Sequence, residues 1–153
     1  PAHRRAERQW PIERYAALAD RLVKEQGASV VWIWGPGEED FVRNAVALCK
    51  EPQLLAPKTS FRELAAFLAN CDLFIGNSNG PSHVAVANTA YSLQLHGTTY
   101  AKAWCPRTRQ HRAVQGGAEL PEHALRDMWL DVESAAKKLR SFGMKKNWTE
   151  KCS

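Results

Sequence analysis

The sequence predicts an α/β domain in which a parallel sheet is covered by helices on both faces. Residues 11–96 alternate between segments with helical spacing of apolar residues and short apolar runs. The run Val30–Trp34 (VVWIW) is apolar throughout, which is typical of a strand buried on both faces. Short connections between the segments favour right-handed crossovers between parallel strands. A doubly wound arrangement is the consequence.

Proline and glycine mark the boundaries of the first elements. A helix is expected to begin at Pro11, which suits a first helical turn, and to stop at Gly27. The apolar strand then ends at Gly35-Pro36-Gly37. Acidic residues Glu38–Asp40 follow, where negative charge favours the start of a helix that runs to about Cys49.

The second half of the alternation contains a capping box, in which Ser60 and Glu63 mark the start of a helix. The expected elements are, in order, a strand at 54–55, a helix over 61–70, a strand over 73–76, a helix from 81 to about 88 and a strand over 91–96. Beyond Gly97 the pattern weakens, and we expect a loop over 98–110, a short strand at 112–115 and a long amphipathic helix over 125–142.

Composition is that of one soluble globular domain spanning residues 1–153, with 44% hydrophobic and 24% charged residues. No apolar run approaches the ~20 residues of a membrane span, and no signal peptide is recognisable. The chain begins PAHRRAERQW, which suggests an interior cut in a longer protein, and residues 143–153 resemble a frayed or tag-like tail. The four cysteines are scattered without metal-ligand spacing, which favours free thiols in a cytoplasmic protein.

The formal net charge is +5, and much of the excess comes from two clusters. Their members are Arg4, Arg5, Arg8 and Arg14 near the start, and Lys137, Lys138, Arg140, Lys145, Lys146 and Lys151 near the end. Such runs are usually a solvated face, but they can also attract the phosphates of a nucleotide, a lipid or a nucleic acid. Charge alone does not choose among these partners. No recognition helix or aromatic-basic sheet motif supports binding to nucleic acid, so the sequence does not favour that partner.

The stretch at 72–88 (DLFIGNSNGPSHVAVAN) predicts an anion site. Ligands of open α/β sheets bind beyond the carboxyl ends of the strands. Here Gly80 and Pro81 would place the free N–H groups of a helix start at that edge, with His83 in the first turn. A phosphate or diphosphate is the natural occupant. Glycine loops at 35–37 and 97–99 would leave the same edge.

Ordinary structural roles compete with each of these readings. Asn, Ser, Gly and Pro occur in any strand–turn–helix connection, and a histidine in a first helical turn is more often a surface residue. Glu38 could simply complement the helix dipole. Lys58 and Thr59 are by default solvent-exposed turn residues.

An ordered set of motifs resembles glycosyltransferase family 9, the ADP-heptose:lipopolysaccharide heptosyltransferases. The stretches that carry the likeness are Arg8-Gln9-Trp10-Pro11, VVWIWGPGEE, PKTSFRELAAFLANCDLFIGN, GNSNGPSHVAVAN, Gly97-Thr98-Thr99 and Trp104-Cys105-Pro106. Each is weak alone, but their order makes the likeness specific over residues 8–115. It implies a Rossmann-like domain that forms the C-terminal, donor-binding half of a GT-B enzyme.

The resemblance also implies roles for particular residues. The expected donor-diphosphate residues are Arg8, Asn79, Gly80, Pro81, Ser82 and His83; those near the donor sugar are Ser78 and Thr98; those near the nucleoside are Gly35, Glu38, Lys58 and Thr59. The family transfers sugar without a metal or other cofactor. The catalytic base is expected in an N-terminal domain that this chain does not contain, so no catalytic residue is assigned here, and the chain by itself is expected to be inactive.

One position departs from the family signature. That signature usually reads Gly-Asn-Asp-(Ser/Thr)-Gly, whereas this chain carries Ser78 in place of the aspartate. A serine can donate a hydrogen bond to a sugar but offers no charge. Either a changed donor sugar or a weakened activity would explain the change.

The expected function is therefore transfer of heptose, or a related sugar, from a nucleoside-diphosphate sugar such as ADP-heptose to a lipid-linked saccharide of the lipopolysaccharide or cell envelope. The expected partners are that donor, that acceptor and the N-terminal domain. The location would be the cytoplasm, with the basic ends able to hold the enzyme at the inner-membrane surface. The alternative is a degenerate, non-catalytic relative that binds a ligand or partner.

Overall fold

A computed structural model describes residues 1–5, 8–88, 91–98, 100–106, 108, 110–115 and 134 of the chain. The helix expected over 125–142, the tail at 143–153 and Thr99 lie outside the described residues, apart from Ser134. The elements, in order, are α1 (Ile12–Gln26), β1 (Val31–Trp32), α2 (Glu39–Ala47), β2 (Leu54–Leu55), α3 (Phe61–Ala69), β3 (Leu73–Asn77), α4 (Gly80–Ala87), β4 (Tyr91–His96), α5 (Ala101–Trp104) and β5 (His111–Gln115). The predicted alternation of helix and strand is confirmed.

Local signals account for the helix ends. Gly27 adopts the left-handed conformation (φ 60°) and its N–H caps α1 by donating to the carbonyl of Val23. At α3 the capping box is complete, because Ser60 Oγ accepts from the N–H of Glu63 while the Glu63 carboxylate accepts from the N–H of Ser60. These bonds satisfy backbone groups that a helix end would otherwise leave unpaired.

All described strand pairs are parallel, as predicted, but the hydrogen-bonded ladder is in two parts. One part pairs β1 with β2, and the other has the order β3-β4-β5. β1 is shorter than the expected strand 30–34, with regular pairing confined to Val31 and Trp32. The β3–β4–β5 ladder is longer, and it brings Gly76 opposite Gln94 and Asn77 opposite Leu95.

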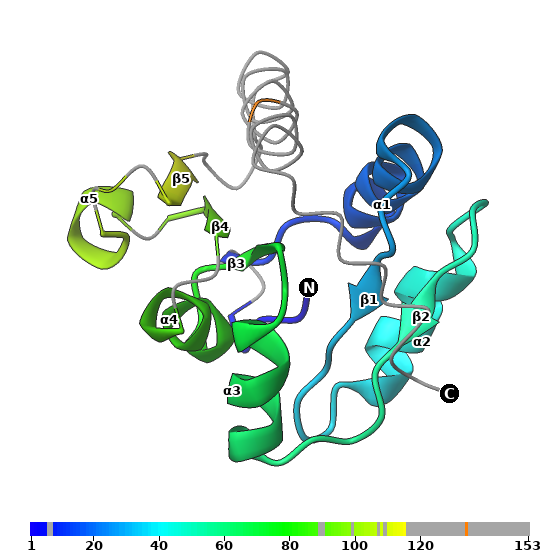
Figure 1. The fold of residues 1–153 in the computed structure, drawn as a ribbon. Helices are drawn as coiled ribbons and strands as arrows, with labels where there is room; N and C mark the ends of the chain where they lie inside the picture. Colours follow the sequence, from blue (N-terminus) through cyan, green and yellow to red (C-terminus); the bar gives the residue numbers. More distant parts are fainter. Residues whose placement is uncertain are drawn as a thin grey trace.

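Helices cover the strands from two sides, with α1 and α2 on one side of the molecule and α3 and α4 on the other (Figure 1). Two hydrophobic clusters correspond to these layers. The first joins α1, α2, β1 and β4, and its buried members include Leu18, Trp32, Val42, Leu93 and Leu95. The second joins α3, β3 and α4 through Leu68, Phe74, Val84 and Ala85. The doubly wound α/β architecture is confirmed.

The stretch after β4 also differs from expectation. The stretch 98–110, expected to be a loop, contains the four-residue helix α5. Its turn is closed by the N–H of Ala103, which donates to Tyr100, and by that of Cys105, which donates to Ala101. A single turn is too short to show helical periodicity in the sequence, which is why the prediction missed it.

Candidate functional site

The end of β3 forms a tight turn into α4, through Ser78 and Asn79. The N–H of Ser78 donates to the Leu95 carbonyl (3.1 Å), which ties the turn to the end of β4. The Ser82 hydroxyl accepts from the N–H of Asn79 (3.3 Å) and donates to its carbonyl (2.7 Å). Ser82 is completely buried, so its side chain shapes the turn from within the protein.

The outer side of this turn is open. Gly80 and His83 are both exposed, and Pro81 is half-buried, at the start of α4. A Cβ built on Gly80 would meet no atom within 4 Å, so there is open space beside this residue. Helix starts favour anions through their N–H groups and dipole.

A second turn, Gly35-Pro36-Gly37-Glu38, follows β1. The N–H of Glu38 donates to the Gly35 carbonyl (3.0 Å), and Gly37 has φ of 78°. With proline second and a positive-φ glycine third, this is the pattern of a type II turn. The Glu38 carboxylate folds back and accepts from the N–H of Gly35 (2.9 Å). One carboxylate oxygen is thus held by its own loop.

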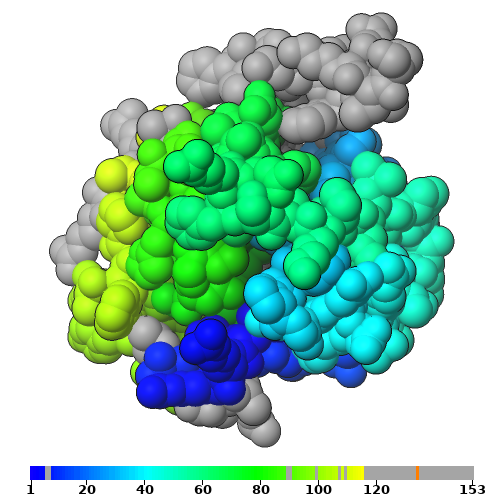
Figure 2. Space-filling model, turned by 90° about the horizontal axis from the view of Figure 1, so that it is seen from below, coloured from blue at the N-terminus to red at the C-terminus, as the bar shows by residue number. Residues whose placement is uncertain are grey.

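A segment that the sequence analysis did not single out lies across this edge. The side chain of Asn77 donates to the Pro1 carbonyl, Asn79 Nδ2 donates to the Ala2 carbonyl (3.3 Å), and His3 Nε2 lies 3.3 Å from the Ser78 carbonyl. Figure 2 shows this segment, in dark blue, between the yellow-green of α5 and the cyan of the first α2 residues.

Three polar side-chain atoms, two from residues 8–10 and one from the turn, are buried without a hydrogen-bond partner among the described residues. They are Arg8 Nε, Trp10 Nε1 and Asn79 Oδ1. Buried polar groups nearly always have a partner, so each such group asks for an explanation. A bound ligand that offers both acceptors and donors would satisfy them.

The structure brings together some of the predicted site residues but not others. Hydrogen bonds connect the N-terminal segment with the turn that contains Ser78, Asn79 and Ser82. In contrast, Lys58 is exposed and Thr59 half-buried between β2 and α3. Thr98 is exposed after β4. Within the described part of the chain, these three make no hydrogen bond to the turn.

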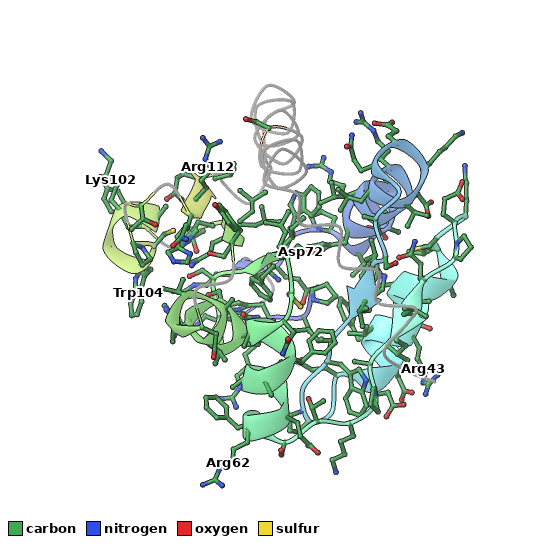
Figure 3. All side chains as sticks on the ribbon, in the orientation of Figure 1. Arg43, Arg62, Asp72, Lys102, Trp104 and Arg112 are labelled. Atoms are coloured by element: carbon green, nitrogen blue, oxygen red, sulfur yellow. The ribbon has the colours of Figure 1, made fainter. Side chains whose placement is uncertain are left out.

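His83 has an aromatic neighbour. Its ring centroid lies 6.1 Å from that of Trp104, with the planes tilted by 54°. Trp104 is 55% exposed and extends from α5 towards the α4 side (Figure 3). Trp104, the first residue of the Trp-x-Pro motif, thus contributes to the surface beside the turn. The sequence analysis assigned it no role.

The face of β4 opposite the Leu93–Leu95 core is polar. Ser92, Gln94 and His96 are all buried on it. Ser92 Oγ lies 3.0 Å from His111 Nδ1, and His96 Nε2 lies 3.3 Å from Gln94 Oε1. Burial lowers the pKa of His111. The alternation Ser-Leu-Gln-Leu-His is the signal in the sequence for this polar face.

In the described ranges, no group of three or more His, Cys, Asp or Glu residues is arranged to hold a metal ion. No helix within those ranges has the length and apolar character needed to cross a membrane.

The parallel strands and the two helix layers define a Rossmann-like α/β domain, with polar turns at the ends of β1 and β3. The model of glycosyltransferase family 9 (heptosyltransferase) matches residues 1–128, and the chain belongs to this family. The sequence is similar to lipopolysaccharide heptosyltransferase 3 of Escherichia coli, with 31% identity over 145 residues that cover 89% of this chain and 42% of the relative.

Solved structures agree on the fold. A glycosyltransferase family 9 structure from Veillonella parvula DSM 2008 superposes with a TM-score of 0.79 at 20% identity, covering 90% of this chain and 44% of that one. The E. coli heptosyltransferase WaaC with ADP superposes with a TM-score of 0.74 at 22% identity, covering 88% and 42%. The chain therefore spans less than half the length of these relatives.

Proposed function

We propose that this domain binds the nucleoside-diphosphate sugar donor of a GT-B glycosyltransferase, as its C-terminal half. The transferred sugar would be heptose or a related sugar, and the acceptor a lipopolysaccharide or other envelope saccharide. Family membership supports the reaction class. Support for the donor comes from WaaC, which has been solved with ADP and with ADP-2-deoxy-2-fluoro heptose.

The observation that carries the proposal is the open helix start at Gly80. The turn places an exposed backbone beside a segment with an unpaired guanidinium nitrogen at Arg8 and an unpaired acceptor at Asn79. N–H groups of a helix start and a guanidinium favour phosphate together, because both present donors to anionic oxygens. His83, exposed in the first turn of α4, is a further donor.

In the proposed reaction an acceptor hydroxyl attacks the anomeric carbon of the donor sugar. The bond between that carbon and the diphosphate oxygen breaks, and the nucleoside diphosphate leaves. Negative charge grows on the leaving diphosphate, so fixed donors at the turn would lower the barrier without a metal ion. The base that takes the acceptor proton belongs to the N-terminal domain in this proposal.

The remaining residues would orient the rest of the donor. Glu38 would accept a hydrogen bond from the ribose, because one of its carboxylate oxygens is not needed to hold Gly35. The stretch of exposed Lys58 and half-buried Thr59 would border the base. Ser78 and Thr98 would face the sugar, each with a hydroxyl that can donate or accept.

Calorimetric titration with ADP and with ADP-heptose at low salt tests the donor site. Binding in the micromolar range, competed by free ADP, is expected. No heat and no thermal shift at millimolar nucleotide would remove the donor-site assignment. UDP at the same concentration serves as the matched control for selectivity of the base.

A second candidate function is a non-catalytic relative, and the serine at position 78 is the observation that favours it. Sugar transfer assayed with the N-terminal half present separates the two. Activity of the native sequence supports the enzyme. If the native sequence has no activity and Ser78→Asp does, the result would support a non-catalytic relative.

The proposed location is the cytoplasm, at the inner-membrane face where a lipid-linked acceptor lies. Arg4 and Arg5 are exposed beside the site edge, and each basic residue near an anionic surface adds about 1 kcal/mol of attraction. Sedimentation with anionic vesicles, reduced in Arg4→Ala/Arg5→Ala, is the measurement.

A further inference from the structure

Asn77, the last residue of β3, holds three segments together from inside the protein. It is 1% exposed. Its Oδ1 accepts from the backbone N–H of Trp10 (3.1 Å) and from the hydroxyl of Tyr15 (3.0 Å). Its Nδ2 donates to the carbonyl of Pro1. One carboxamide thus connects the end of β3 with α1 and with the N-terminal segment.

The strand pattern makes a polar residue unexpected at this position. Asn77 follows Leu73 and Ile75 on the same face of β3, and both of those pack against the core that contains α1. Burying an amide there is costly unless its hydrogen bonds are made. Because Asn77 makes three bonds to segments distant in the chain, its role is to fix those segments.

The other contacts between the turn and the N-terminal segment are weaker. The His3–Ser78 and Asn79–Ala2 contacts are 3.3 Å long and lie between partly exposed residues. Water can compete for such bonds, whereas the bonds of Asn77 are shielded. Asn77 is therefore the buried anchor of this junction.

We propose that Asn77 is a positioning residue of the donor site, an inference that rests on the proposed function. It holds the stretch that contains Arg8 and Trp10 in fixed register with Ser78–Gly80. The guanidinium and the helix start then converge on the same diphosphate. Being buried, Asn77 acts through these groups and does not itself touch the ligand.

The test compares three variants of the full chain. Asn77→Leu keeps the shape of the side chain and removes all three hydrogen bonds, without adding a charge. Tyr15→Phe removes a single bond to Asn77 and keeps the ring that packs edge-on against Trp10. Leu18→Val is the stability control, because Leu18 belongs to the same core and makes none of these bonds. Thermal unfolding is measured for each.

Binding of ADP is measured by calorimetry and binding of adenosine, which lacks the phosphates, by ligand-observed NMR. Asn77→Leu is expected to weaken ADP binding about tenfold or more, the scale of losing charge-assisted bonds. Adenosine binding stays unchanged. Tyr15→Phe gives a smaller loss in the same direction and adds nothing in the Asn77→Leu background.

Equal loss of ADP and adenosine binding would overturn the proposal, as would ADP binding no weaker than in Leu18→Val. Should Asn77→Leu fail to fold, Tyr15→Phe decides, and an ADP affinity equal to the wild type would overturn the proposal. A wild-type chain that binds no ADP refutes the proposed function instead, so the two failures are distinguishable.

Discussion

A Cβ built on Gly76 would lie 2.7 Å from Cζ of Phe74, two residues earlier in β3. Phe74 belongs to the core between β3, α3 and α4, and its ring folds over the backbone of Gly76. The glycine at position 76 is thus required by packing, whereas Gly80, four residues later, borders open space. The two glycines of the signature turn have different physical roles.

We expect Gly76→Ala to destabilise the protein by about 1–3 kcal/mol, the usual cost of forcing a group into a packed core. Denaturant unfolding followed by circular dichroism measures the change. Phe74→Leu in the Gly76→Ala background should recover part of the loss, because the ring is what the new methyl meets. No loss in Gly76→Ala would contradict the packing role.

Gly80→Ala should have the opposite profile. Its Cβ meets no protein atom, so unfolding should change by less than about 0.5 kcal/mol. The methyl would occupy the space where we place the diphosphate, and ADP affinity should fall by about tenfold, or 1.4 kcal/mol. Full retention of ADP affinity in this variant would argue against a ligand at the helix start.

The capping box of α3 gives a prediction independent of function. Ser60→Ala removes the acceptor for the N–H of Glu63 and should cost about 1 kcal/mol of unfolding free energy. Ser60→Asp, which keeps an acceptor at the N-cap, is the matched control and should stay near the wild type. A comparable loss in both variants would contradict the capping explanation.

His111 makes stability depend on pH. Its folded pKa lies below the usual 6.5 because burial disfavours the charged ring. The unfolded chain therefore binds a proton at His111 more readily than the folded chain does. The free energy of unfolding is consequently highest above pH 6.5 and declines as the pH falls towards the folded pKa. Urea unfolding from pH 7.5 to 5 should show this decline. The decline in the free energy of unfolding should be smaller in His111→Gln.

Local order along the chain was predictable because it depends on neighbouring residues. The capping pair Ser60–Glu63 and the glycine stop at Gly27 act within a few positions, and the structure places both as expected. The short α5 was missed because one turn shows no period. The burial of Ser92, Gln94 and His96 was not predicted, because it depends on the elements that pack against β4.

Only the local part of the candidate site could be predicted from the sequence, because local structure depends on neighbouring residues. The turn around Gly80 could be expected from its own residues, since a strand, a glycine and a helix start are consecutive there. The likeness to glycosyltransferase family 9, carried by the order of short motifs, is confirmed by the family match. The individual roles expected for Arg8, Glu38 and Ser78 stay predictions.

Folding in three dimensions decided which distant segments meet at this turn. Pro1–His3 and Asn77–Asn79 are more than 70 positions apart, yet hydrogen bonds join them. No local pattern encodes such a junction, because it exists only when β3, α1 and the N-terminal segment have packed together. The choice of partner for the Asn77 carboxamide is a property of that packing.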